Sequence, residues 1–260
     1  MRQGSGRWRI PRAWRPRRFA LVTDFGRGPY TGQIQLLLAA HRPRRPVVDL
    51  VSDLTPFRPD LAGLLLPGLR RGMPGRTLYL CVVDPGVGGA RGILAARVGA
   101  DWLLAPDNGL LVPLLRGSAP TDVRLWRVLW RPPTLSASFH GRDLFTPLAQ
   151  QIARGRLPQA TPVDVADLVG ADRPATTATV CYVDRYGNVM TGIPARELSD
   201  AAVVVIGDTR VAHARTFSDV AVGTPFWYEN AFGLVEIAVN QGRADVDLSL
   251  HPGDSITCRP

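Results

Sequence analysis

The chain has 260 residues, of which 45% are hydrophobic and 20% are charged, as in an ordinary globular protein and unlike a disordered one. No stretch approaches the roughly 18 uncharged apolar residues that a membrane-spanning helix needs, so we expect no membrane partner. All 31 basic residues are arginine, which excludes Schiff-base lysines, pyridoxal-phosphate chemistry and the phosphate-binding GK[ST] loop.

The net charge of +9 is concentrated at the N-terminus. Residues 1–18 contain seven arginines and no acid, which leaves a net charge of only +2 for residues 19–260. We therefore expect residues 1–18 to form a disordered, arginine-rich tail. The alternative is an arm that binds RNA or a membrane surface, with Trp8 and Trp14 interleaved among the arginines.

The first half of the remaining chain alternates between strand-like and helix-like patterns. Continuous apolar runs that end in Gly, Pro, Asp or Asn turns predict strands at residues 19–26, 46–54, 76–89, 93–99 and 101–109, and intervening patterns predict helices at residues 30–41, 60–71 and 141–155. Runs without alternation are typical of strands buried on both faces, as in a parallel sheet covered by helices. Residues 19–165 are thus predicted to form a Rossmann-like α/β catalytic domain with a mostly parallel sheet.

The second half of the chain has a different pattern. A segment that mixes Pro, Asp and Ala marks a boundary near residues 156–175. The segments that follow are short, alternating and rich in turns, which indicates antiparallel strands. Residues 172–260 are therefore predicted to form a smaller, antiparallel, β-barrel-like domain. The three cysteines are far apart and form no CxxC pair, so we expect no disulfide framework and a cytoplasmic location.

Polar residues that follow the predicted strands are candidates for chemistry. Asp24, Asp84 and Asp107 each end an apolar run beside a tight turn, and ligands of open α/β sheets bind beyond the carboxyl ends of the strands. Arg91 follows Asp84 across a glycine-rich turn, so the two can form an ion pair. His140 begins a predicted helix in the sequence FHGRD. The alternatives are a turn-forming role for each aspartate, a packed histidine and a surface arginine.

Five motifs in this order resemble one family, the S-adenosyl-L-methionine hydroxide adenosyltransferases, which are relatives of the fluorinase and chlorinase enzymes. The motifs are TDFGRGPYTG (23–32), VVDPGVGGAR (82–91), PDNGLL (106–111), FHGRDLFTP (139–147) and DRYGNVMTGI (184–193). The resemblance implies hydrolysis of S-adenosyl-L-methionine to adenosine and L-methionine, by attack of water or hydroxide on ribose C5′. It implies no metal and no cofactor, and a homotrimer whose active sites lie between subunits.

The resemblance also implies roles for individual residues. Asp84, Arg91 and His140 match the catalytic triad of the family; we expect His140 to accept the proton of water, Arg91 to stabilise hydroxide and Asp84 to orient Arg91. The expected substrate-binding residues are Asp24 at the ribose, Asn188 at the adenine, Phe217 stacked on the adenine, and Asn230, Ala231, Glu236 and Val239 around its polar edge.

Three other functions compete with this hypothesis. A halide-dependent adenosyltransferase is disfavoured because the halogenating relatives do not keep the triad. A nucleic-acid-binding protein with a degenerate S-adenosyl-L-methionine pocket would use the arginine-rich tail, but we expect no nucleic-acid partner. A metal-dependent hydrolase would gather Asp24, Asp84, Asp107 and His140 around an ion.

Overall fold

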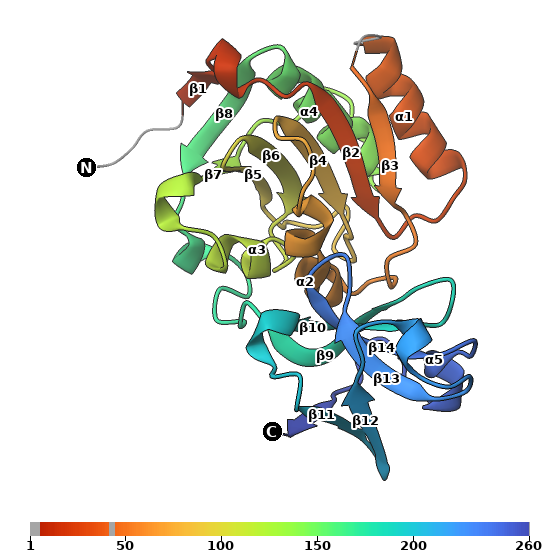
Figure 1. Cartoon of the computed structure of the whole chain (residues 1–260). Coiled ribbons are helices and arrows are strands. Elements are labelled where there is room, and N and C mark those ends of the chain that lie inside the picture. The colour runs from red at the N-terminus through yellow and green to blue at the C-terminus, as the bar shows by residue number, and fades with distance from the viewer. Residues whose placement is uncertain (1–5, 42–44, 260) are drawn as a thin grey trace. The chain divides into compact units, whose positions relative to one another are not determined.

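A computed structural model describes residues 6–41 and 45–259. It is a mixed α/β structure with two sheets (Figure 1). The chain forms two compact units: residues 1–59 with 73–173, and residues 60–72 with 174–260. Among the described residues, no helix combines the length and the apolar character needed to cross a bilayer.

The first unit is built on an eight-stranded sheet in the order β1-β8-β7-β5-β6-β4-β2-β3. Its strands are β1 (Gly6–Arg9), β2 (Arg18–Thr23), β3 (Val47–Val51), β4 (Thr77–Val82), β5 (Ile93–Val98), β6 (Asp101–Pro106), β7 (Val123–Val128) and β8 (Arg156–Pro162). Its helices are α1 (Pro29–His41), α3 (Val112–Arg116) and α4 (Thr146–Ala153), with short helical turns η1 (Arg12–Trp14), η2 (Pro120–Asp122), η3 (Gly141–Phe145) and η4 (Val165–Asp167).

The sheet of the first unit is mixed, so the prediction of a mostly parallel sheet is wrong. Strands β3, β2, β4 and β6 are parallel neighbours, whereas every pairing from β6 through β5, β7 and β8 to β1 is antiparallel. Only Gly99 and Ala100 separate β5 from β6, and a parallel pair needs a crossover of about a dozen residues. A continuous apolar run indicates that a strand is buried on both faces, but it does not distinguish a parallel from an antiparallel neighbour.

Residues 6–18, here called the strap, differ from the expected disordered tail because their apolar side chains are anchored on the sheet. β1 pairs with β8, and Figure 1 shows the two strands side by side at one end of the sheet. Ile10 is buried, Trp8 packs edge-on against Trp126, and the backbone carbonyl of Trp14 accepts a hydrogen bond from the indole of Trp102 at 2.8 Å. Three spaced apolar residues thus fix a segment whose composition alone indicates disorder.

The ring of Trp14 also separates two like charges. Arg97 and Arg124 are cross-strand partners on β5 and β7, and their guanidinium carbons lie 4.1 Å and 5.3 Å from the centroid of the Trp14 ring. The negative face of an aromatic ring attracts cations, so the ring offsets the repulsion between the two arginines.

We predict that Trp14→Ala lowers the free energy of unfolding by about 2 to 3 kcal/mol, since it removes apolar burial and both cation–π contacts. Urea denaturation at neutral pH measures the change. Arg17→Ala is the matched control, because Arg17 is an exposed strap residue. Equal stability of the two variants would contradict the anchoring role of the strap.

The second unit is a curled, mostly antiparallel sheet in the order β15-β11-β12-β13-β14-β10-β9. Its strands are β9 (Thr177–Val183), β10 (Val189–Pro194), β11 (Val203–Ile206), β12 (Thr209–His213), β13 (Pro225–Glu229), β14 (Leu234–Val239) and β15 (Thr257–Arg259). Only β12 and β13 are parallel neighbours. A bridge between Thr179 and Ser255 links the two ends of this order, so the sheet forms a partial barrel.

Three short helical elements and one longer helix complete the described part of the second unit. They are η5 (Ala195–Glu197), η6 (Phe217–Asp219), α5 (Ala244–Asp247) and α2 (Pro59–Arg70). All of α2 except its first residue groups with the second unit, although we assigned this segment to the N-terminal domain. A side chain at Gly68 would place its Cβ 2.6 Å from Cβ of Phe232, so glycine is required for this close packing.

Candidate active site

The parallel strands of the first unit end together at one edge of the sheet. β2, β4 and β6 are consecutive neighbours, and Asp24, Asp84 and Asp107 follow them. The side-chain amide of Asn108 donates a 2.9 Å hydrogen bond to the carbonyl of Val83, which ties the ends of β6 and β4 together. This edge is where the fold is expected to bind ligands.

The predicted ion pair between Asp84 and Arg91 is confirmed, and it extends to His140. Nε of Arg91 donates to both carboxylate oxygens of Asp84 at 2.9 Å, and Nη2 of Arg91 also bonds to Asp84. The same Nη2 lies 2.8 Å from Nδ1 of His140. The side chains of Asp84 and Arg91 are 4% and 10% exposed, and His140 is buried. A carboxylate, a guanidinium and an imidazole are therefore linked away from bulk water.

The glycine-rich turn after β4 brings Arg91 back to Asp84. Gly88 has a φ of +81°, a conformation that residues with a Cβ rarely adopt. A Cβ at this position would lie 2.5 Å from the carbonyl oxygen of Ala137. The turn therefore packs directly on the loop that leads to His140, which fixes the distance between the two halves of the triad.

The loop before His140 is held from its other side by Asp143. Oδ2 of Asp143 accepts a 3.1 Å hydrogen bond from the backbone N–H of Ser136. Arg142 pairs with the same carboxylate. His140 immediately precedes the π-helical turn η3, so both sides of its backbone are fixed.

The contact with Arg91 decides the protonation state of His140. A guanidinium has N–H donors and no acceptor, so Nδ1 of His140 must accept and the neutral ring carries its proton on Nε2. Burial lowers the pKa of His140, and the positive charge of Arg91 lowers it further. From the sequence we expected His140 to accept the proton of water; in the arrangement seen here Nδ1 is occupied, and Nε2–H is a donor.

Asp24 lies in the same unit as the triad but is not hydrogen-bonded to it. Its Oδ2 accepts a 3.1 Å hydrogen bond from the backbone N–H of Phe57. Burial raises the pKa of Asp24; the bond from Phe57 opposes this, and the negative charge of Asp84 adds to it. Asp24 is thus a half-buried acceptor near Asp84.

Asp107 has a structural role. Its carboxylate pairs with Arg127 at 2.9 Å and accepts a 3.0 Å hydrogen bond from the backbone N–H of Val169. Over the ranges 6–41 and 45–259, no three His, Cys, Asp or Glu side chains are grouped as metal ligands. The cluster of Asp24, Asp84, Asp107 and His140 required by the metal-dependent alternative is therefore not formed.

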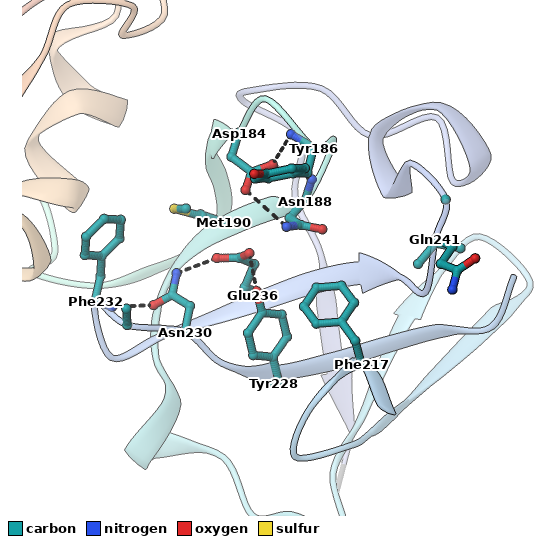
Figure 2. A pocket seen from close by; sticks show the side chains of 13 residues that line it. Asp184, Tyr186, Asn188, Met190, Phe217, Tyr228, Asn230, Phe232, Glu236 and Gln241 are labelled. Carbon is teal, nitrogen blue, oxygen red and sulfur yellow. Dashed lines mark hydrogen bonds between the residues drawn. The ribbon is translucent and has the colours of Figure 1, made fainter. Parts of the chain in front are cut away.

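The second unit contains a cavity of about 610 Å³ (Figure 2). Six of the expected substrate-binding residues line it: Asn188, Phe217, Asn230, Ala231, Glu236 and Val239. The lining residues that sequence reasoning missed are Asp184, Tyr186, Met190, Tyr228, Phe232, Gln241 and Gly242. Residues from strands β10, β13 and β14 and from the neighbouring turns therefore converge on one pocket.

A buried carboxylate organises the pocket. Glu236 is 2% exposed, and it accepts hydrogen bonds from the hydroxyl of Tyr228 at 2.5 Å and from the amide of Asn230 at 2.6 Å. Burial raises the pKa of Glu236, and these two bonds oppose the rise. Oδ1 of Asn230 in turn accepts the backbone N–H groups of Phe232 and Leu234. Glu236 thus fixes Tyr228 on the neighbouring strand directly, and through Asn230 it fixes the loop that follows β13.

The opposite part of the pocket presents an oriented amide and an aromatic ring. Asp184 accepts the side-chain N–H of Asn188 at 3.1 Å and its backbone N–H at 2.9 Å. This leaves Oδ1 and the second amide proton of Asn188 to pair with the donor and acceptor on a purine edge. Phe217 lies 5.6 Å from Tyr228, ring to ring, and Figure 2 shows its ring facing the same space as Glu236.

Of the residues that sequence reasoning missed, Asp184 could have been predicted from its motif, whereas Tyr228 could not. Asp184 stands in the motif DRYGN, so an orienting role for it was within reach of the sequence. Tyr228 is opposite Glu236 in the register of β13 and β14, and that register is not readable from a pattern of short alternating strands.

A buried, hydrogen-bonded group of titratable side chains at a strand edge, and a pocket with few polar groups among apolar ones, define a small-molecule enzyme. Residues 19–161 match the family model for the SAM hydroxide adenosyltransferase N-terminal domain, and residues 178–257 match the model for the C-terminal domain. The chain therefore belongs to the S-adenosyl-L-methionine (SAM) hydroxide adenosyltransferase family, as its motifs predicted.

Similar proteins span nearly the whole chain. A Thermus thermophilus protein named (R)-S-adenosyl-L-methionine hydrolase is 36% identical over 248 residues, covering 89% of this chain and 95% of its own. A Salinispora arenicola protein of the same name is 32% identical over 250 residues, covering 91% and 95%. The crystal structure of an uncharacterized conserved protein from Thermotoga maritima superposes with a TM-score of 0.80 at 26% identity, covering 93% of this chain and 100% of that one.

We predict that His140 remains neutral, with its proton on Nε2, at pH values near 6.5, where an ordinary histidine is half protonated. Nitrogen-15 NMR of the labelled imidazole measures both the tautomer and the pKa. Arg91→Gln removes the positive charge beside Nδ1 and leaves Asp84 uncompensated, so the pKa of His140 rises. An ordinary pKa in the unmodified protein, unchanged by Arg91→Gln, would contradict the assignment.

The same shift predicts the sign of one pH effect on stability. Because the pKa of His140 is lower in the folded state than in the unfolded state, protonation favours unfolding. The stability that neutral His140 contributes is present above about pH 6.5 and is lost as the pH falls below it.

Proposed function

We propose that this protein hydrolyses S-adenosyl-L-methionine to adenosine and L-methionine, by attack of water or hydroxide on ribose C5′, without a metal or cofactor. The observation that carries the proposal is the linked set of Asp84, Arg91 and His140 at the strand edge. Membership of the family, and similarity over most of the chain to proteins named (R)-S-adenosyl-L-methionine hydrolase, support it.

The leaving group of the reaction needs no assistance from the protein. As a C5′–O bond forms, the C5′–S bond breaks and its electron pair goes to sulfur, so the positively charged sulfonium leaves as the neutral thioether of methionine. No general acid is required at that side. The protein must instead hold an oxygen nucleophile in line with the departing sulfur, and positioning of this kind can contribute several kcal/mol.

Two donors of the triad are suited to hold that oxygen. Nη1 of Arg91 carries two N–H groups that bond to none of the described residues, and His140 offers Nε2–H. Both would donate to a hydroxide, or to water that becomes hydroxide as its proton leaves for solvent. Asp84 acts as a positioning residue, because its carboxylate fixes the guanidinium from the other side. Donors placed in advance of the reaction stabilise developing charge without reorganisation.

The remaining expected residues would bind the substrate. The carboxylate of Asp24 would accept hydrogen bonds from the ribose hydroxyls. In the pocket of the second unit, the amide of Asn188 would pair with the adenine edge, Phe217 would stack on the ring, and Glu236 would accept from the 6-amino group. Asn230, Ala231 and Val239 would form the walls around the base.

We further propose a homotrimer in which the first unit of one subunit and the second unit of the next enclose the substrate. An apolar surface on the first unit supports an oligomer: Leu36 on α1 is 70% exposed and Val48 on the edge strand β3 is 45% exposed. Large exposed apolar side chains gathered at a sheet edge are typical of protein interfaces. The three cysteines are free, which agrees with a cytoplasmic location.

We predict that His140→Ala and Arg91→Ala each lower turnover by about 10²-fold or more, because each removes a donor to the nucleophile. Chromatography of the products from S-adenosyl-L-methionine measures turnover and identifies adenosine and methionine. Both variants should still bind adenosine in titration calorimetry, whereas Asn188→Ala should bind it more weakly. Near-normal turnover of either triad variant, or absence of adenosine among the products of the unmodified protein, would refute the proposal.

A further inference from the structure

The net charge is positive in the first unit and negative in the second. The first unit has 23 arginines, 11 aspartates and no glutamate, a net charge of +12, whereas the second has eight arginines and 11 acids, a net charge of −3. The strap supplies much of this excess. The proposed hydrolysis uses only Arg91 among the arginines of the first unit, so most of the positive charge has no role in it.

Folding of the strap gives its arginines fixed positions. Trp8 packs on Trp126, and side chains alternate along a strand, so Arg9 points to the other side of β1 from Trp8. Arg9 is the direct register partner of Arg156 on β8, and both are exposed. Like charges in directly opposed positions destabilise a sheet, and no acid lies between them to offset the repulsion.

Two further contacts place arginines of the sheet beside the strap. The backbone of Ile10 bonds to Gly155, beside Arg156, and Arg124 approaches the ring of Trp14 in the strap. We define the arginine surface as six exposed residues: Arg7, Arg9, Arg12, Arg17, Arg124 and Arg156. None of the six makes an ion pair with any residue in the described ranges.

Two acids of the first unit, Asp122 and Asp101, lie close to the strap, and neither forms an ion pair with any of the six arginines. Asp122 acts electrostatically on Arg97, which lies beneath Trp14, and Asp101 is buried, where it accepts the backbone N–H of Thr77. The surface therefore presents guanidinium groups that lack anionic partners within the described chain. Guanidinium groups bind phosphate bidentately, and they do so through a planar pair of N–H donors.

We propose that the arginine surface binds the phosphodiester backbone of nucleic acid. A phosphate between Arg9 and Arg156 would convert their repulsion into two attractive contacts. An anionic membrane is the less suitable partner, because Ile10 is buried and Trp8, which is 40% exposed, packs on Trp126, so the strap has little apolar surface to insert into lipid. From the sequence we expected no nucleic-acid partner, since the basic residues gather in a tail expected to be disordered; residues 6–18 are instead folded on the sheet. This binding goes beyond the proposed hydrolysis and does not depend on it.

Fluorescence anisotropy with a fluorescein-labelled, mixed-sequence single-stranded RNA of about 20 nucleotides tests the proposal between about 50 and 300 mM NaCl. Each phosphate contact adds about −0.7 to the slope of log K against log salt for a single strand. We expect Arg9→Gln with Arg156→Gln to flatten the slope by about 1.4 and to weaken binding about ten-fold at low salt. Arg9→Lys with Arg156→Lys keeps both charges and should retain most of the affinity.

The matched control is Arg210→Gln with Arg259→Gln, which removes the same net charge from exposed positions of the second unit. The slope of the control should match that of the unmodified protein. If the unfolding temperature of the first pair falls, Arg7→Gln with Arg17→Gln must reproduce its effect. Equal losses in the control and the strap variants, absence of salt-dependent RNA binding, or tighter binding to phosphatidylserine vesicles than to RNA would each overturn the proposal.

Discussion

The guanidinium of Arg91, shared between a carboxylate and an imidazole, is the interaction on which the rest of the site depends. A buried charge must be paired, and Asp84 pairs Arg91 through both carboxylate oxygens. Because the guanidinium can only donate, it fixes the tautomer of His140 and opposes protonation of the ring. We therefore propose that the triad acts as a set of oriented donors, which suits stabilisation of a hydroxide better than removal of a proton from water.

The second unit applies the same principle to binding. Glu236 is buried among strands, and its two hydrogen bonds hold Tyr228 and Asn230 in place. A pocket whose polar groups are satisfied by one another before the ligand arrives loses little conformational entropy on binding. The proposed reaction requires C5′ to be held in line with the nucleophile, and we propose that this rigid pocket contributes by holding the adenine.

Sequence reasoning succeeded where a short motif defines the local geometry. The turn after β4 and the segment FHGRD allowed the Asp84–Arg91 pair and the place of His140 beside it to be predicted, and six of the expected binding residues share one pocket. It failed where distant segments decide the outcome. The direction of β5 depends on a two-residue connection, the strap depends on the packing of Trp8 and Trp14, and the contact of Tyr228 depends on strand register. The tautomer of His140 follows from a distance that no pattern contains.

The central claim is that an oxygen atom from solvent displaces the thioether at ribose C5′. The most direct measurement is a reaction of the purified protein with S-adenosyl-L-methionine in water enriched in oxygen-18, followed by mass spectrometry of both products. We expect one heavy oxygen in the 5′-hydroxyl of adenosine and none in methionine. Unlabelled adenosine, or label that enters methionine instead, would contradict attack at C5′ by a solvent-derived nucleophile.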